Sequence, residues 1–136
     1  GGTIKLGNVE ITMVNATHSS SMIVDKKLMY TGAESGYVIK GEGKTLYFSG
    51  DTDVMADMEI IQDLHKPEIG ILSCGGHFTM DMKRAAYAAK KYFKFSKVIP
   101  CHYKTFPLLE QNAETLIKEL GSDVVIEPEV MKPIEL

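Results

Sequence analysis

Three side chains of the kinds that bind metal ions stand out in the sequence. They are His18, Asp51 and His102, and each follows a run of apolar, strand-forming residues and precedes polar or turn-forming ones. Neutral imidazole and carboxylate are natural ligands for divalent ions such as zinc, manganese and iron. If the three residues follow strands of one sheet, they lie along one rim, where α/β folds place their ligands. Three such residues supply at most half of a two-metal site.

Each of these residues also has a purely structural interpretation. A single His in an apolar setting is more often a hydrogen-bonded packing residue than a ligand, and Gly-Asp-Thr at 50–52 is a common turn in which Asp bonds its own backbone. The joint pattern favours metal binding, because none of the three falls on a predicted helix. In that interpretation Gly50 allows a sharp turn and the two oxygens of Asp51 can bridge two cations, with Asp53 as the fallback ligand.

His77 follows two glycines and precedes a helix that we expect to be capped by Thr79 and to run to about Tyr92. A helix N-terminus offers unpaired N–H groups and partial positive charge to an anion. We therefore expect His77 to donate a hydrogen bond or a proton to an anionic substrate, with Thr79 and Met80 lining the site. The alternative is an ordinary loop residue.

The elements that position these residues follow from hydrophobic periodicity and turn signals. Two hairpins come first, then alternating helices and strands, and a long polar loop from 16 to about 35 separates the hairpins. The expected strands are 3–6, 9–14, 36–40, 45–49, 69–74, 97–100 and 124–126, and the expected helices are 55–65, 79–92 and 113–120. This order predicts an α+β fold, a mixed sheet with helices on its outer face and a second face that needs another layer.

Composition excludes several classes of protein. The 136 residues suffice for one core, and a net charge of −3 without a basic stripe argues against nucleic-acid binding. No apolar stretch is long enough for a membrane span, and two cysteines suit a reducing compartment, so we expect a cytoplasmic protein. Both Cys74 and Cys101 are expected to be buried structural residues. Neither a Gly-x-Ser-x-Gly elbow nor a phosphate-binding loop is present.

Four motifs, in order, resemble the metallo-β-lactamase-fold metal-dependent hydrolases, in particular the L-ascorbate-6-phosphate-lactonase-like group; they are residues 15–20, 48–52, 75–80 and 101–107. The resemblance implies an αββα sandwich and two divalent metal ions, zinc first, with manganese, iron or nickel as alternatives. It makes His18 a ligand of one metal, Asp51 the bridging carboxylate and His102 a ligand of the other. The implied reaction is hydrolysis of a lactone, ester or phosphoester, with an anionic substrate, by a metal-activated water, so Asp51 and His77 are the candidate catalytic residues.

One departure from this family is large, because its His-x-His-x-Asp-His loop is absent. We therefore expect residues 1–136 to be the C-terminal half of a single domain, lacking an initiator Met, weak in metal binding and inactive alone. The other half, a complementary chain or a cleaved segment, would carry that loop, and an oligomer is expected. The alternatives are a non-catalytic subunit or interaction module and, ranked last, a nuclease or RNA-processing enzyme.

Overall fold

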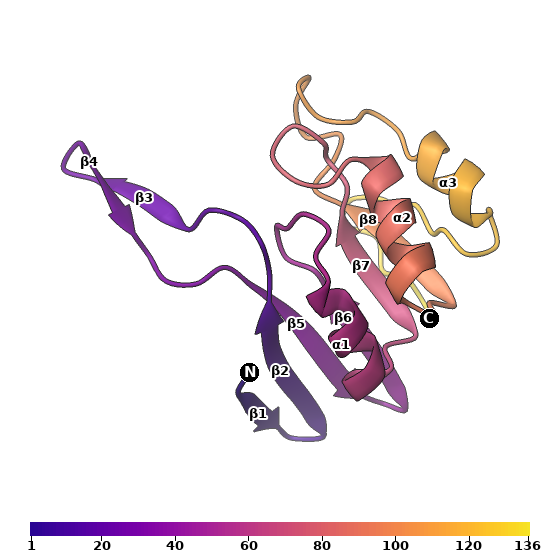
Figure 1. Cartoon of the computed structure of the whole chain (residues 1–136). Coiled ribbons are helices and arrows are strands. Elements are labelled where there is room, and N and C mark those ends of the chain that lie inside the picture. Colours follow the sequence, from indigo (N-terminus) through magenta and orange to yellow (C-terminus); the bar gives the residue numbers. More distant parts are fainter.

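The computed structural model describes all 136 residues as a six-stranded mixed sheet, three helices and a separate hairpin (Figure 1). The sheet has the order β1-β2-β5-β6-β7-β8. Its strands are β1 (Thr3–Leu6), β2 (Val9–Asn15), β5 (Ser35–Gly41), β6 (Lys44–Phe48), β7 (Ile69–Ser73) and β8 (Lys97–Cys101). The helices are α1 (Asp57–His65), α2 (Met82–Tyr92) and α3 (Glu114–Leu120). This architecture confirms the predicted α+β class and the mixed sheet.

Four strands of the sheet run in the same direction. β6, β7 and β8 pair in parallel, and β2 shares their direction because β5 lies between β2 and β6 and is antiparallel to both. The carboxyl ends of these four strands therefore meet along one side of the sheet, which we call the site edge. The candidate residues all follow these ends within a few positions, as the sequence predicted.

The helices cover one face of the sheet, the closed face, and the core lies between them (Figure 1). Tyr47 of β6 is fully buried there and stacks on Phe93, with ring centroids 5.1 Å apart. α2 can lie close to the strands because it turns alanines toward them; Ala85, Ala86, Ala88 and Ala89 are all buried. Burial of this apolar surface away from water stabilises the layer.

The opposite face of the sheet, the open face, is also apolar but carries no helix. Neighbouring strands align its side chains in rows across the sheet, for example Met13 beside Tyr37 and Tyr37 beside Phe48. The exposed apolar residues of this face are Ile4, Leu6, Met13, Tyr37 and Phe48. Residues 134–136 reach its other end, beside Ile39 and Leu46. The elements of this chain leave this apolar face uncovered, and exposed apolar surfaces of this kind are typical of interaction sites.

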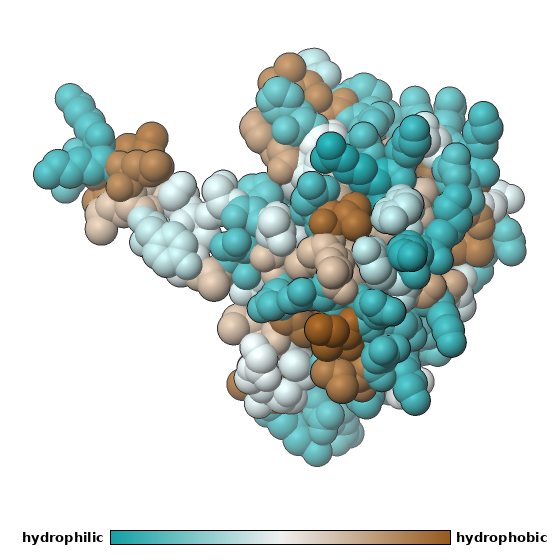
Figure 2. All heavy atoms as spheres, in the orientation of Figure 1, coloured by the Kyte–Doolittle hydropathy of each residue, from teal (hydrophilic) through white to brown (hydrophobic).

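The segment predicted to be a polar loop contains a hairpin instead. β3 (Ser21–Val24) pairs with β4 (Lys27–Tyr30) as a separate two-stranded sheet that projects away from the body (Figure 1). All eight strand residues are exposed, with Ile23 at 73% and Leu28 at 75%, and Figure 2 shows brown apolar atoms on this hairpin. We call residues 20–31 the arm. At its base Thr31 N–H donates to Ser20 O at 3.1 Å.

Two further expectations need correction. Asp81, not Thr79, is the N-cap of α2, and its carboxylate accepts the Arg84 N–H. Residues 124–126 form no strand, only a parallel bridge between Val125 and Val98. The remaining predicted strands and helices match within a few residues at their ends.

Candidate functional site

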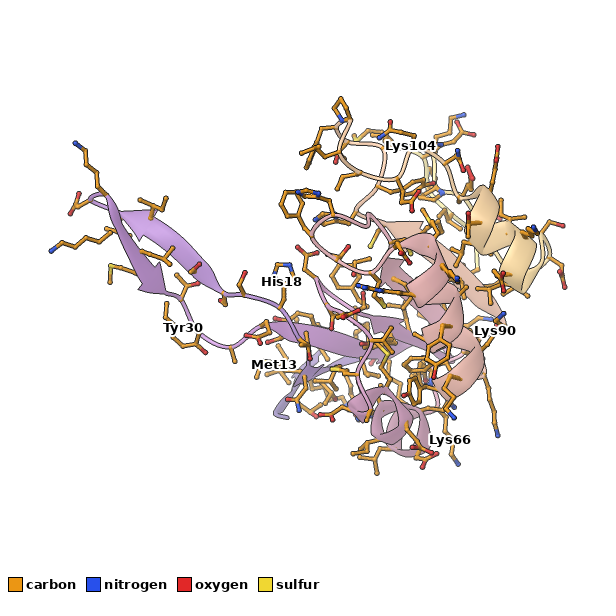
Figure 3. The ribbon with its side chains drawn as sticks, turned by 45° about the horizontal axis from the view of Figure 1, so that its top comes forward. Met13, His18, Tyr30, Lys66, Lys90 and Lys104 are labelled. Carbon is orange, nitrogen blue, oxygen red and sulfur yellow. The ribbon has the colours of Figure 1, made fainter.

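The loops that follow the four parallel-running strands carry the candidate residues to the site edge. His18 follows β2, Asp51 follows β6, His77 follows β7 and His102 directly follows β8. Figure 3 shows His18 where the arm joins the body, with Tyr30 farther out on the arm. The arrangement places four polar side chains from distant parts of the sequence along one side of the sheet.

Asp51 and His102 come together as a pair, with His102 Nε2 3.5 Å from Asp51 Oδ2. Gly50 makes the turn before Asp51 with a φ of 61°, and a Cβ at this position would overlap the carbonyl oxygen of Ser35. The sharp turn predicted for Gly50 is therefore confirmed. Two ligands of one tetrahedral zinc ion lie about 3.3 Å apart, so this nitrogen and this oxygen have the spacing of two ligands of a common ion.

The backbone of Gly75 packs closely against His102. A Cβ on Gly75 would overlap the His102 carbonyl oxygen and lie 2.9 Å from its ring Nδ1. The lack of a side chain at Gly75 therefore makes room for the backbone and the imidazole of His102. Nδ1 is buried and has no hydrogen-bond partner, which leaves Nε2 as the nitrogen that faces Asp51. His102 itself has a φ of 57°, so the chain leaves strand geometry at this residue.

His18 does not join this pair. Its Nδ1 lies 2.9 Å from Ser19 O and its Nε2 lies 3.0 Å from Phe78 O. Each ring nitrogen thus faces a backbone carbonyl, and the neutral ring donates its single N–H to one of the two. No group of three His, Cys, Asp or Glu side chains in the chain is arranged to hold a metal ion. The expected convergence thus extends to Asp51 and His102 and not to His18. The donor set therefore fits a divalent cation only in part.

His18 instead shares a cavity of about 940 Å³ with His77. Asp53, Thr79 and Arg84 also line it. The Phe78 ring meets the His77 ring edge-on, with centroids 4.5 Å apart. His77 is exposed at this cavity.

Met80 was expected to line this cavity and does not, because it is fully buried in the core. Thr79 lines the cavity but is itself buried, and its hydroxyl donates to Met80 O at 3.3 Å. The N-terminus of α2 also differs from expectation: the Asp81 carboxylate accepts the Arg84 N–H at 2.7 Å, so a negative charge already occupies it. A substrate anion at that helix end would meet this carboxylate.

Arg84 is a cavity residue that sequence reasoning missed. Its Nη1 lies 3.5 Å from Asp53 Oδ1 at the cavity wall. A signal was available, since Arg84 is the only arginine among 15 basic residues and lies close to the start of the helix predicted after His77. A guanidinium presents a planar fork of donors that suits carboxylate and phosphate.

Both cysteines are unpaired. Cys74 is buried, as expected, and burial is the main cause that raises the pKa of its thiol. Cys101 is half-buried, and burial together with the nearby Asp51 carboxylate raises its thiol pKa to about 12. Both thiols are protonated at neutral pH, which disfavours a thiolate nucleophile or ligand.

This chain is similar in sequence to known families and proteins. A model described as the β-lactamase superfamily domain matches residues 1–103. The chain belongs to the β-lactamase superfamily. A "UPF0173 metal-dependent hydrolase" of Dinoroseobacter shibae is 65% identical over all 136 residues, and one of Paracoccus denitrificans is 62% identical over the same length.

Solved structures share the fold. Igni18, described as a novel metallo hydrolase from the archaeon Ignicoccus hospitalis, superposes with a TM-score of 0.78 at 34% identity, over 95% of this chain and 55% of that one. The metallo-β-lactamase fold expected from the motifs is thereby confirmed. The chain spans 59% of the length of the two bacterial relatives. No helix of this superfamily member combines the length and apolarity that crossing a bilayer would require.

Proposed function

We propose that the whole protein is a metal-dependent hydrolase and that residues 1–136 supply part of a two-metal site. The observation that carries the proposal is the Asp51–His102 pair, 3.5 Å apart at the site edge. In this proposal Asp51 bridges two ions, His102 binds one and His18 binds the other. Zinc is the first candidate, because imidazole and carboxylate oxygen suit it, and manganese, iron or nickel are alternatives.

The remaining ligands come from outside these residues. The open face supports this part of the proposal, because a sheet with exposed Met13, Tyr37 and Phe48 is suited to packing against a second layer. The relatives are longer, and the chain spans 59% of their length. We infer that residues 1–136 are one half of an αββα domain and that a complementary half carries a His-x-His-x-Asp-His loop. Its position on the same or another polypeptide, the oligomeric state and a cytoplasmic location stay predictions.

Binding of His18 to a metal requires a change at its ring. Nε2 now contacts Phe78 O at 3.0 Å, and a ligand nitrogen must present its lone pair to the cation instead. A rotation of the imidazole away from that carbonyl would free Nε2. The Ser19 carbonyl, 2.9 Å from Nδ1, can then accept the remaining N–H and fix the tautomer, the role that backbone carbonyls have beside metal-binding histidines.

In this proposal some residues of the chain hold the metal ions and others contact the substrate. A divalent cation, when bound, lowers the pKa of a coordinated water toward neutrality and polarises the bond to be cleaved. Asp51 and His102 fix where that cation lies relative to the sheet. His77, exposed at the cavity, is placed to donate a hydrogen bond or a proton to the substrate, with Thr79 beside it.

The proposed substrate is an anionic lactone, ester or phosphoester, as in the lactonase-like group. Arg84 supports the anionic part, because it is the only Lys or Arg side chain on the cavity wall. Three carboxylates also line the cavity, those of Asp53, Asp81 and Glu110. Asp53 pairs with Arg84 and Asp81 caps α2, so both are already engaged.

Replacement of Asp51 in the full-length protein tests the proposal. Asp51→Ala is expected to reduce hydrolysis of a panel of chromogenic esters, lactones and phosphodiesters to the background rate and to lower the bound metal per protein. Asp63→Ala, an exposed change on α1 away from the site edge, is the matched control and should retain both. Wild-type turnover in Asp51→Ala, with metal-free protein inactive, would remove Asp51 from the mechanism.

A non-catalytic role is the second candidate, favoured by the lack of a three-ligand group within this chain. Full-length protein that carries no metal after purification and growth with added zinc, and that hydrolyses nothing in the panel, would support this candidate.

A further inference from the structure

Thr52, next to Asp51, connects three of the site-edge loops. We propose that Thr52 is a positioning residue that sets the placement of His18 relative to Asp51. This inference rests on the proposed function, in which both of those residues hold metal ions. Thr52 is fully buried although its neighbours Asp51 and Asp53 are exposed, so its side chain points into the protein while theirs face outward.

The hydroxyl of Thr52 makes two hydrogen bonds. Its Oγ1 accepts the Thr17 N–H at 2.9 Å and donates to Asp53 O at 2.9 Å. The Asp53 bond is local and is typical of a turn. The Thr17 bond is different, because it joins positions 35 residues apart and holds the residue that directly precedes His18. No other acceptor meets the Thr17 N–H in the structure.

Backbone bonds extend the connection. Asp53 N–H donates to Thr17 O at 3.1 Å, so the two loops exchange a pair of bonds. Met80 N–H donates to Thr52 O at 3.2 Å, which fixes the loop of His77 and Phe78 to the same residue. Because Phe78 O in turn contacts His18 Nε2, Thr52 fixes both the backbone before His18 and the carbonyl against its ring.

Threonine suits this position because a hydroxyl can accept and donate at once. Thr52→Val keeps the shape of the side chain but removes both bonds and leaves the Thr17 N–H without its partner. Thr52→Ser keeps the hydroxyl. Thr45→Val is the control for the chemical change itself, since Thr45 lies on β6, the strand that precedes Thr52, and its hydroxyl takes part in none of the side-chain hydrogen bonds that hold the site-edge loops.

The test uses full-length protein, with zinc as the probe. Affinity is measured by titrating metal-free protein with zinc against a chromogenic chelator, and exchange of the Thr17 amide is followed by NMR without metal. Residues that orient metal ligands contribute about 10- to 100-fold to metal affinity. Thr52→Val is therefore expected to lower the affinity for one of the two zinc ions by this factor. Thr17 exchange should accelerate in Thr52→Val, whereas Thr52→Ser and Thr45→Val should match wild type in both measurements.

Three results would overturn the role of Thr52. They are unchanged zinc affinity in Thr52→Val, unchanged exchange at Thr17, and an equal loss of affinity in Thr45→Val, which would indicate general destabilisation. Wild-type full-length protein that binds no zinc would overturn the proposed function instead. The exchange of Thr17 in metal-free protein would then decide by itself whether Thr52 holds the His18 loop.

Discussion

The two faces of the sheet are built from the same strands but differ in what covers them. On β6, Tyr47 points to the closed face and is fully buried under Phe93, while its neighbour Phe48 points to the open face and remains 36% exposed. Side chains on successive strand residues point to opposite faces, so an apolar pair of this kind predicts burial on both sides. The difference teaches that burial of a strand residue depends on the layer above its face of the sheet, and not on its apolar character alone.

The largest expected effect comes from truncating this neighbouring pair. In the 136-residue chain, Tyr47→Ala should lower the free energy of unfolding by about 4 kcal/mol, because removal of a buried aromatic ring leaves a cavity. Phe48→Ala in the same chain should lower it by about 1 kcal/mol, since the ring is already partly in water. Urea denaturation followed by circular dichroism measures both changes.

The same two variants in full-length protein complete the comparison. There Phe48→Ala should become about as costly as Tyr47→Ala, about 3 to 5 kcal/mol, if another layer covers the open face. A cost that stays near the value in the short chain would mean that Phe48 faces solvent in the whole protein, and the sandwich would lose its main support.

A smaller effect on stability is expected from a substitution at the site edge. Gly50→Ala places a Cβ at a φ of 61° and against the Ser35 carbonyl, so it should lower the free energy of unfolding by at least about 2 kcal/mol. Gly43→Ala is the control, because Gly43 also has a positive φ but nothing lies within 4 Å of its Cβ. Equal losses in the two variants, by urea denaturation, would mean that the contact with Ser35 is unimportant.

The smallest effect is expected on the arm. The double change Ile23→Ser and Leu28→Ser should alter the stability of the body by less than about 0.5 kcal/mol, because both side chains are exposed. Ile61→Ser, on the buried side of α1, is the contrasting control and should be strongly destabilising. A large loss in the arm variant, measured by thermal unfolding, would show that the arm packs against the body in solution.

The sequence predicts the fold where the signals are local. The hairpin turns, the apolar run of β7 and the helical spacing of α1 depend on near neighbours in the sequence, and these elements were found where expected. The turn at Gly50 belongs to the same class. The joint position of Asp51 and His102 followed from a general rule, that parallel strands bring their carboxyl ends to one edge.

The errors arise where tertiary contacts choose between local options. Thr79 and Asp81 are both good N-cap residues. The structure selects Asp81 because Met80, between them, is fixed outside the helix: its N–H donates to Thr52 O and its side chain is buried in the core. The ring of His18 faces a carbonyl 60 residues away, which no local pattern reveals. The arm was missed because its apolar residues run consecutively, at 22–24 and 28–30, without the alternation of polar and apolar residues that marks the first hairpin.

The buried thiol of Cys74 provides a natural probe of local opening in the strands beside the site. Cys74 lies just after β7, and its backbone N–H donates to the Cys101 carbonyl at the end of β8 at 2.9 Å. Because the Cys74 side chain is fully buried, an alkylating reagent reaches its sulfur only after the structure around it opens. The rate of Cys74 alkylation under native conditions therefore measures local opening beside His102. It can be followed by mass spectrometry with no engineered probe.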